Sequence, residues 1–242
     1  MRNYKLTIQY DGSGYAGWQI QENSNTVQGT ISDAIHILLK EKVNLIGSGR
    51  TDSGVHALGQ IANFRFNQSI DVHRFMHSLN SILPDDISIT NFEVVDEKFH
   101  SRFDAKERSY LYLVSKYKSP FYNNYSMLKK NLNILHLNKI ANVLLGEHDF
   151  SSFCRKNSDV KNKNCKVTSI GWKETGNFYL FFISADRFLH GMVRTIVGTL
   201  LKVESLKEAQ LTLKKIMNAR NREAAGEAVA AKGLFLRKVT YF

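Results

Sequence analysis

One carboxylate stands out among the polar residues of this sequence. Residues 47 to 60 read GSGRTDSGVHALGQ and place Asp52 in a glycine-rich loop between apolar segments. An aspartate in such a loop commonly hydrogen-bonds to its own backbone and has only a structural role. A carboxylate can also act as a nucleophile, a general base or a metal ligand. Arg50, His56 and Gln60 share the loop, and loops on buried flanks often carry catalytic groups, so both interpretations stay open.

A metal site is the least favoured of these chemical roles. Mg²⁺ usually takes one or two carboxylates together with substrate phosphate, and no second acid lies near Asp52 in the sequence. His56 follows closely, but a histidine at such a place is more often a turn or core residue than a ligand. We therefore expect no metal at this loop.

The composition indicates a polyanionic partner. The chain has 33 Lys and Arg residues against 22 Asp and Glu, a net charge of +11 and an isoelectric point near 9.6. Nucleic acid is the first candidate for such a partner and acidic lipid the second. The sequence lacks the run of about 18 apolar residues that a membrane span needs, and its first residues enter an alternating pattern, so we expect a cytoplasmic protein that does not use a membrane.

The cysteines exclude two further classes of site. Cys154 and Cys165 are the only ones in the sequence. Two cysteines are too few for a disulfide framework or for a zinc site built from cysteine spacing. We expect both thiols to be reduced.

A second chemical candidate lies in a helical pattern near the C-terminus. Positions 192, 193, 196, 197, 200 and 201 form one apolar stripe of a helix. At about 100° per residue, Arg194 falls on the opposite side together with Gly191 and Gly198. This face allows close approach by another backbone or by RNA. The alternative is an ordinary solvated arginine.

Strands and helices are predicted in both halves of the chain. Residues 4–10 alternate as a strand, and the apolar positions from Val27 to Leu39 fit one helix face with Thr26 as its N-cap. Further strands are expected at residues 62–66, 87–95, 109–115, 166–174, 178–185 and 233–242. Further helices are expected at residues 72–82, 137–145, 186–203 and 206–219.

This order predicts an α+β fold in two halves. The strands of residues 1–104 form one sheet, and this half carries the Asp52 loop. Residues 105–242 share a rough order of elements with the first half, without visible sequence repetition, and carry the second chemical candidate, Arg194. No linker rich in proline, serine or glycine separates the halves.

The loop motif resembles that of the tRNA pseudouridine synthase A family. The family signature GRTDxGVHAxGQ is present from Gly49 to Gln60. Family-like segments also include YDGSGYAGWQ (10–19), TVQGTI (26–31), FHSRFDAKERSY (99–110), LLGEHDFSSF (144–153), FLHGMVRTIVGTLL (188–201) and GLFL (233–236). The resemblance spans nearly the whole chain. It implies that Asp52 is the nucleophile that converts uridine to its C-glycoside isomer, with no cofactor and no metal.

The resemblance also implies roles for other residues. Arg194 would pair with Asp52, keep it ionised and orient it. Tyr110, which pattern alone would make a core aromatic, would contact the target base and is a candidate for removing the C5 proton. Leu234 would form an apolar wall of the pocket, although a core position is a close alternative. Arg50 would contact phosphate or fill the space of an extruded base, or else hold a loop carbonyl.

The excess positive charge can supply the binding energy needed to extract a uridine from a stem. Flipping a base out of a stem costs a few kcal/mol, and one aromatic stack returns about 1 to 3 kcal/mol, so phosphate contacts must supply most of the affinity. The candidate contact residues are Phe99, His100, Ser101, Arg102 and Phe103. Basic residues of the loop 154–167 are further candidates: Arg155, Lys156, Lys161, Lys163 and Lys166.

The resemblance sets the remaining expectations. It implies two ferredoxin-like α/β halves with mainly antiparallel sheets joined across a central basic cleft, a homodimer, and action on the anticodon stem-loop of tRNA at positions 38, 39 and 40. Residues 164–167, Asn-Cys-Lys-Val, depart from the arginine-threonine pattern expected there. Two other functions compete: a non-catalytic RNA-binding protein, and an aspartyl-phosphate phosphotransferase, which needs Mg²⁺ and more acids.

Overall fold

The computed structural model describes residues 1–156 and 160–241. The chain divides into two compact units, one of Met1–Lys106 with Phe235–Phe242 and one of Glu107–Leu234. The last strand of the chain is thus part of the first unit, whereas a single boundary near residue 104 would leave it in the second. Alternation within a strand shows that one face is buried but does not reveal which sheet the strand joins.

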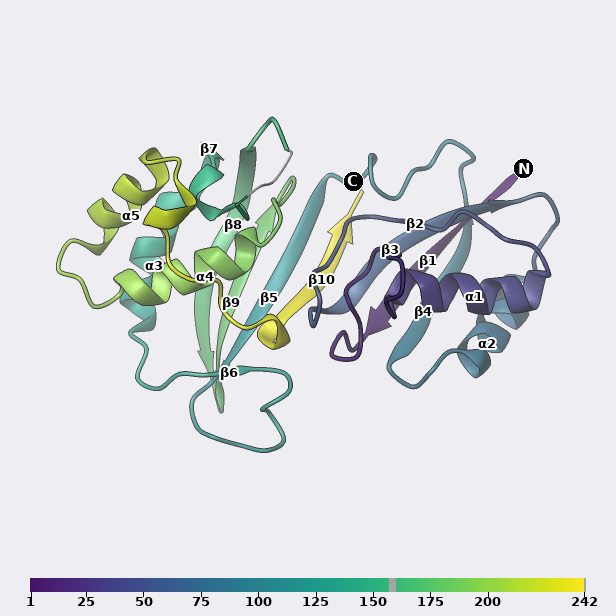
Figure 1. The fold of residues 1–242 in the computed structure, drawn as a ribbon, viewed down its shortest axis with the longest axis horizontal. Coiled ribbons are helices and arrows are strands. Elements are labelled where there is room, and N and C mark those ends of the chain that lie inside the picture. The colour runs from purple at the N-terminus through teal and green to yellow at the C-terminus, as the bar shows by residue number, and fades with distance from the viewer. Residues whose placement is uncertain (157–159, 242) are drawn as a thin grey trace. The chain divides into compact units, whose positions relative to one another are not determined.

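The first unit is a sheet with two helices beside it (Figure 1). Its sheet order is β4-β1-β3-β10, and β2 also pairs with β3. β10 runs parallel to β3, and the other neighbours are antiparallel. The elements are β1 (Arg2–Tyr10), α1 (Val27–Leu39), β2 (Ile46–Gly47), β3 (His56–Phe66), α2 (Val72–Ile82), β4 (Ile87–Val95) and β10 (Leu234–Thr240).

Aromatic packing joins the sheet of the first unit to α2. Tyr4 on β1 stacks on Phe64 and Phe92, with ring centroids 5.6 and 5.4 Å away. Phe75 on α2 packs on Phe92 at 5.0 Å. At the start of α1, the Thr26 Oγ1 accepts a hydrogen bond from the Gly29 N–H at 3.3 Å, as predicted, and such a cap contributes about 1 kcal/mol.

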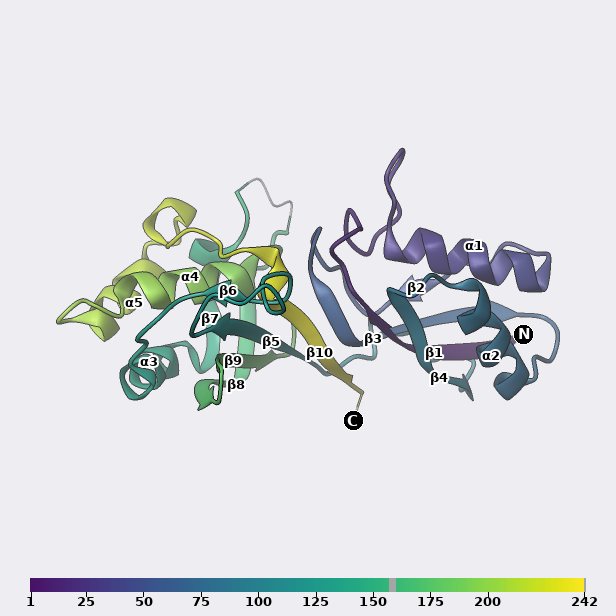
Figure 2. The ribbon, with the colours of Figure 1, turned by 90° about the horizontal axis from the view of Figure 1, so that it is seen from below.

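The second unit has the same general plan (Figures 1 and 2). Its sheet order is β5-β9-β8-β7, antiparallel throughout, with the short β6 parallel to β5. Helices α3, α4 and α5 contact one another beside the sheet. The elements are β5 (Glu107–Ser115), β6 (Met127–Leu128), α3 (Ile134–Ala141), β7 (Gly146–Asp149), β8 (Asn164–Thr175), β9 (Phe178–Ala185), α4 (Met192–Val203) and α5 (Ala209–Asn218).

The α+β class with mainly antiparallel pairing is confirmed, but the helix predicted at 186–203 begins only at Met192. The Asp186 carboxylate accepts hydrogen bonds from the N–H groups of Lys166 and Arg187 at 2.8 and 2.7 Å, and an aspartate bonded in this way competes with helix formation. Gly191 follows with φ +72°, so the backbone enters the helix from a left-handed residue. Residues 186–191 form a turn ahead of α4.

Other boundaries differ because local polar groups decide them. α3 begins at Ile134, since the Asn133 side chain caps it by accepting from the His136 N–H at 3.0 Å. The strand predicted from residue 62 begins at His56, because Gly59 hides the alternation that marks a strand. A Cβ at Gly59 would lie 2.8 Å from the Arg237 carbonyl oxygen of β10, so the missing side chain allows that close approach.

Among the described residues, no helix has the length and the hydropathy needed to cross a membrane.

Candidate active site

The Asp52 loop occupies residues 48–55, between β2 and β3 of the first unit. Asp52 is half-buried there, and the residues that flank it on the loop, Thr51 and Val55, are buried. The Val55 N–H donates to the Asp52 carbonyl oxygen at 3.1 Å, and Gly54 adopts φ +74°. These two features close a tight turn directly after the carboxylate, so the backbone of Asp52 has a fixed direction.

Residues 10–18 form the seat of this loop. The Trp18 N–H donates to the Thr51 carbonyl oxygen at 3.1 Å, and the Tyr10 hydroxyl lies 2.8 Å from the Thr51 Oγ1. The Ser53 hydroxyl donates to the Tyr15 carbonyl oxygen at 3.1 Å. Both residues beside Asp52 are therefore tied to the same segment.

Two glycines of the seat allow the backbones to touch. Gly17 has φ +106°, and a Cβ there would lie 2.6 Å from the Thr51 carbonyl oxygen. A Cβ at Gly12 would lie 2.0 Å from the Val55 carbonyl oxygen. Any other residue at either position would displace the loop. The family-like segment YDGSGYAGWQ thus has a physical purpose that its sequence pattern did not reveal: it positions Asp52.

Of two polar signature residues near Asp52, Gln60 supports the loop through hydrogen bonds and Arg50 lies at the surface. Gln60 is fully buried; its Oε1 accepts from the Ser48 hydroxyl at 2.6 Å, and its Nε2 donates to the Gly49 carbonyl oxygen at 3.0 Å. Arg50 is exposed, and its Nε donates to the Gln19 side chain at 3.2 Å. Gln60 is a structural residue, whereas the position of Arg50 leaves its guanidinium at the surface.

His56 is a buried residue of the first unit and is 1% exposed. Its ring stacks on Phe235 with 4.6 Å between centroids. Both the Gly12 N–H and the Asp11 carboxylate lie 3.1 Å from its Nδ1. One nitrogen cannot accept from Gly12 and donate to Asp11 at once, so the two contacts are alternatives set by the tautomer. In either case His56 packs inside the unit, as a core histidine does.

The predicted contact residues 99–103 form a turn in the first unit. The exposed Arg102 and Phe103 and the half-buried His100 lie together: the ring centroids of His100 and Phe103 are 4.3 Å apart, and the Arg102 guanidinium carbon lies 5.6 Å from the Phe103 ring centroid. Phe103 is 73% exposed. The turn therefore presents an imidazole, a guanidinium and an aromatic face to solvent, a combination suited to stacking on bases and pairing with phosphate.

Two members of the turn have structural roles. Ser101 is 0% exposed, and its hydroxyl donates to the Ile46 carbonyl oxygen at 2.5 Å. The side chain thus supports the strand that leads to the Asp52 loop, and contact of Ser101 with substrate stays a prediction. Phe99 is half-buried and packs on Tyr241 at 5.0 Å. The sequence alone does not show which side chains of a turn point into the protein and which point to solvent.

Arg194 projects from α4 of the second unit and is half-buried. Its Nε donates to the Val229 carbonyl oxygen at 2.7 Å, and the Val229 N–H donates to the Arg194 carbonyl oxygen at 3.2 Å. A Cβ at Gly198 would lie 1.8 Å from the Glu227 carbonyl oxygen. The glycine on this helix face thus admits another backbone, which is one of the two alternatives predicted for it, and that backbone fixes the arginine.

Tyrosines of β5 lie on the same side of the second unit. The buried Tyr112 donates its hydroxyl to the Ala230 carbonyl oxygen at 2.9 Å. Burial raises the pKa of Tyr112 well above its ordinary value, and the nearby Arg194 charge opposes this shift. Tyr110, two residues earlier on the same strand face, is half-buried and contacts Phe188 edge-on at 5.1 Å. Leu234 is buried, as its alternative role as a core residue requires, and its role as a pocket wall stays a prediction.

The comparisons decide the family. A family model described as tRNA pseudouridine synthase matches residues 6–104 and 140–241. A tRNA pseudouridine synthase A 2 of Clostridium perfringens is 43% identical over 244 residues, and the match covers 100% of both chains. The chain belongs to the tRNA pseudouridine synthase A family. Because this is a family of isomerases, the chain is an enzyme.

Further relatives agree with this assignment. A tRNA pseudouridine synthase A of Acetivibrio thermocellus is 43% identical over 247 residues, again with 100% of both chains covered. Among solved structures, a Cbf5-Nop10-Gar1 complex aligns with 82% of this chain and 54% of the other at 11% identity, with a TM-score of 0.37. Membership in the synthase family rests on the sequence relatives.

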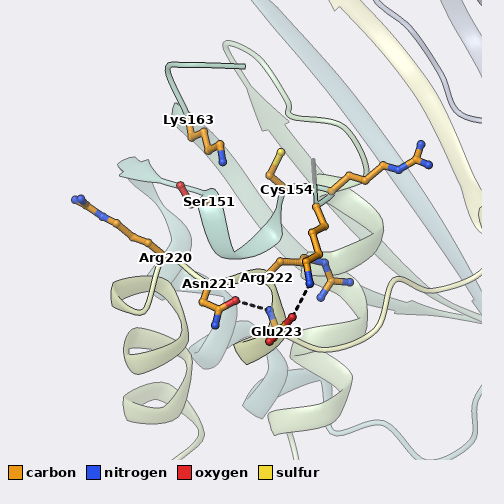
Figure 3. Close-up of a pocket in the computed structure, with 9 residues that line it drawn as sticks. Ser151, Cys154, Lys163, Arg220, Asn221, Arg222 and Glu223 are labelled. Carbon is orange, nitrogen blue, oxygen red and sulfur yellow. Dashed lines mark hydrogen bonds and ion pairs between the residues drawn. The ribbon is translucent and has the colours of Figure 1, made fainter. Parts of the chain in front are cut away.

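A basic hollow lies in the second unit of this synthase (Figure 3). It has a volume of about 380 Å³. The predicted contact residues Arg155, Lys156 and Lys163 line it, and Arg220 and Arg222, which sequence reasoning missed, line it as well. Lys161 and Lys166 are exposed and lie outside this lining. Residues 157–159 of the predicted loop fall outside the described residues.

Cys154 lines this hollow, and both it and Cys165 are free and buried. Burial raises the pKa of the Cys165 thiol to about 12, and the Arg187 charge opposes this shift. A thiol of that pKa is protonated at neutral pH and is a poor nucleophile. Within the described residues, no group of three or more His, Cys, Asp or Glu side chains is placed to hold a metal ion.

Proposed function

We propose that this synthase isomerises uridine to pseudouridine in the anticodon stem-loop of tRNA, among positions 38, 39 and 40, with Asp52 as its nucleophile. The observation that carries the proposal is the seat of Asp52. The carboxylate is half-buried on a loop whose neighbours on both sides are tied to residues 10–18. A nucleophile needs a fixed direction of attack, whereas an aspartate that only stabilises a turn does not.

The reaction conserves all atoms and electrons. The Asp52 carboxylate attacks either C1′ of the ribose or C6 of the uracil and forms a temporary covalent bond. The N1–C1′ bond breaks, the base turns, and C5 bonds to C1′ as the carboxylate is released. The C5 proton leaves and N1 takes up a proton. The net change is an isomerisation for which one carboxylate suffices.

The proposal gives the second unit the supporting roles. Arg194 pairs with Asp52, keeps it ionised and aims it through its guanidinium, whose orientation the Val229 carbonyl fixes. Tyr110 contacts the target base and is the candidate for accepting the C5 proton. Leu234 forms an apolar wall for the uracil. These roles require the two units to share a basic cleft, which is part of the proposal.

RNA contacts in the proposal come from two surface segments, one in each unit. His100, Arg102 and Phe103 form one surface of the first unit. Arg50 meets phosphate or takes the place of the extruded base, and the basic loop of residues 154–167 meets the backbone. The family resemblance further implies a cytoplasmic homodimer. Sedimentation of the purified chain tests the dimer, and a monomer at micromolar concentration would contradict it.

Replacing the nucleophile tests the central claim. Asp52→Asn keeps the shape of the side chain but removes its nucleophilic charge, so we expect turnover to fall by about 10⁴-fold or more while tRNA affinity stays within a few fold. The measurements are pseudouridine mapping in an anticodon-arm tRNA and binding of the same unmodified tRNA.

The controls separate the competing functions. Asp33→Asn makes the same change at an exposed position of α1, away from the loop, and it should retain the activity. An RNA-binding protein without catalysis would form no pseudouridine even as wild type. A phosphotransferase would lose its activity in excess chelator, whereas the proposed synthase keeps it. Full turnover by Asp52→Asn would reject Asp52 as the nucleophile.

A further inference from the structure

The hollow of the second unit is lined mainly by charged residues, and none of its lining residues is a large apolar or aromatic one. Its cationic side chains are Arg155, Lys156, Lys163, Arg220 and Arg222, and its one carboxylate is Glu223. Pockets for small organic ligands are lined mainly by apolar and aromatic groups. A hollow with five cations and one carboxylate is instead suited to an anion with several acceptor oxygens.

Backbone contacts fix the two walls of the hollow. The buried Ser152 Oγ accepts from the Asn221 N–H at 3.1 Å and donates to the Ile216 carbonyl oxygen at 2.6 Å. The Asn221 side chain accepts from the Glu223 N–H at 3.0 Å. On the other wall, the Arg155 N–H donates to the His190 carbonyl oxygen at 2.9 Å. The cations therefore project from an ordered frame.

The side chains in the hollow differ in how firmly they are already paired. In Figure 3, Lys163 extends toward the hollow from above, and Asn221, Arg222 and Glu223 form its lower side. The Arg220 Nε lies 3.2 Å from the Asp149 carboxylate, so this arginine already has an acidic neighbour. The Arg222 Nη1 donates to the Gly226 carbonyl oxygen at 3.0 Å, which fixes its direction.

Glu223 occupies the place of an anion in this cluster. Its Oε1 lies 2.8 Å from the Lys156 Nζ, and the two side chains are 69% and 73% exposed. Lys156 lowers the pKa of Glu223 through a hydrogen bond and its charge, so the pair is ionised at neutral pH. An ion pair this exposed contributes little to stability. A phosphate with more than one available oxygen can replace the glutamate at small cost.

We propose that this hollow binds a backbone phosphate of the RNA substrate, and that the phosphate displaces Glu223 from Lys156. The inference rests on the proposed tRNA substrate but adds a site that does not touch the reacting base. Lys163 and Arg222 supply further donors to the phosphate. The Glu223 carboxylate competes with the RNA phosphate for Lys156, so it lowers the affinity of the enzyme for RNA.

The two members of the ion pair give opposite predictions. Lys156→Gln removes a phosphate contact, so we expect tRNA affinity to fall about threefold to tenfold and the slope of log K against log salt to shrink by about 1. Glu223→Gln removes the competitor, so affinity should rise about twofold to fivefold. Both effects should appear mainly in KM, because the hollow holds the RNA and not the reacting base. The measurement is binding of unmodified tRNA to the full chain at several salt concentrations.

Matched controls remove the same charges outside the hollow. Lys214→Gln and Glu208→Gln change exposed side chains of the same unit that do not line it, and each should change affinity less than twofold. An effect of Glu223→Gln no larger than that of Glu208→Gln would overturn the proposal. So would weaker binding by Glu223→Gln, because that result would mean the ion pair only supports the fold.

A competition experiment identifies the source of the phosphate. Millimolar inorganic phosphate should displace tRNA no better than matched ionic strength does, because a single ion lacks the other contacts of the RNA. Tight binding of inorganic phosphate, lost in Lys156→Gln while tRNA binding is unaffected, would assign the hollow to a free anion and reject the RNA site. Pseudouridine formation by the wild type is scored separately. A wild type without turnover would reject the proposed function and leave the binding result interpretable.

Discussion

The Asp52 loop and the turn at residues 99–104 belong to the same unit, yet they are built in opposite ways. The loop is held by buried backbone contacts at Thr51 and by Gly17, where no side chain fits. The turn is anchored by one buried residue, Ser101, and otherwise presents exposed side chains such as Phe103. This contrast supports the proposal that the loop serves a reaction, which depends on position, and that the turn serves contact, which depends on accessible surface.

The difference between the loop and the turn predicts different kinetic effects of mutations in the two segments. Changes that disturb the seat of Asp52 or its proposed partner should lower kcat, because they alter the transition state more than the bound ground state. Changes on the exposed turn should raise KM and leave kcat nearly constant, because they remove uniform binding.

The largest of these effects is expected at Arg194. Arg194→Lys keeps the positive charge but loses the planar fork that the Val229 carbonyl orients. We expect kcat to fall by about 10²-fold or more, in the range for loss of one charge-stabilising donor. Single-turnover rates with saturating tRNA are the measurement.

A surface arginine supplies the control for this variant. Arg74→Lys makes the same change on an exposed position of α2 and should leave kcat within twofold. The partnership with Asp52 is examined further by combining Arg194→Lys with Asp52→Asn. If the effects multiply as independent losses, the two residues do not act as a unit.

Some features of the Asp52 and Arg194 regions could be predicted from the sequence, and others could not. Residue types and spacing placed Asp52 in a glycine turn and Arg194 on a helix face, because a turn and a helical period are local properties. The roles predicted for both residues came from the family resemblance. The role of Gly12 and Gly17 was not predicted, because it depends on a contact across about 40 residues between two loops. Arg222 and Glu223 were missed for the same reason. Their local sequence, residues 221–224 (NREA), has no pattern that predicts a wall of a basic hollow.

A smaller effect is expected when the seat of the loop is disturbed. Gly17→Ala places a Cβ 2.6 Å from the Thr51 carbonyl oxygen at a backbone φ of +106°, so the loop must shift. We expect kcat to fall about tenfold to a hundredfold, since a displacement of about 1 Å can cost that much, while tRNA affinity changes less than threefold. Circular dichroism must show an intact fold for the result to count.

Another glycine of the same segment is the matched control. A Cβ at Gly14 meets only the Asp86 carboxylate, at 4.0 Å, so Gly14→Ala should keep near-normal turnover. Equal kcat values for the two alanine variants would show that the seat does not position Asp52, and the contrast between loop and turn would lose its physical basis.

The smallest effect is expected at the exposed turn. Phe103→Ala removes an aromatic face that is 73% exposed and flanked by His100 and Arg102. We expect KM to rise about fivefold, the equivalent of the ~1 kcal/mol at the low end of base stacking, with kcat unchanged. Phe103→Trp should restore the wild-type KM, because a larger ring stacks at least as well. Phe121→Ala removes a phenylalanine of the second unit that is 82% exposed, and it should have less effect. A fall in kcat for Phe103→Ala would place this ring in the reaction itself, and the assignment of the turn to contact alone would be wrong.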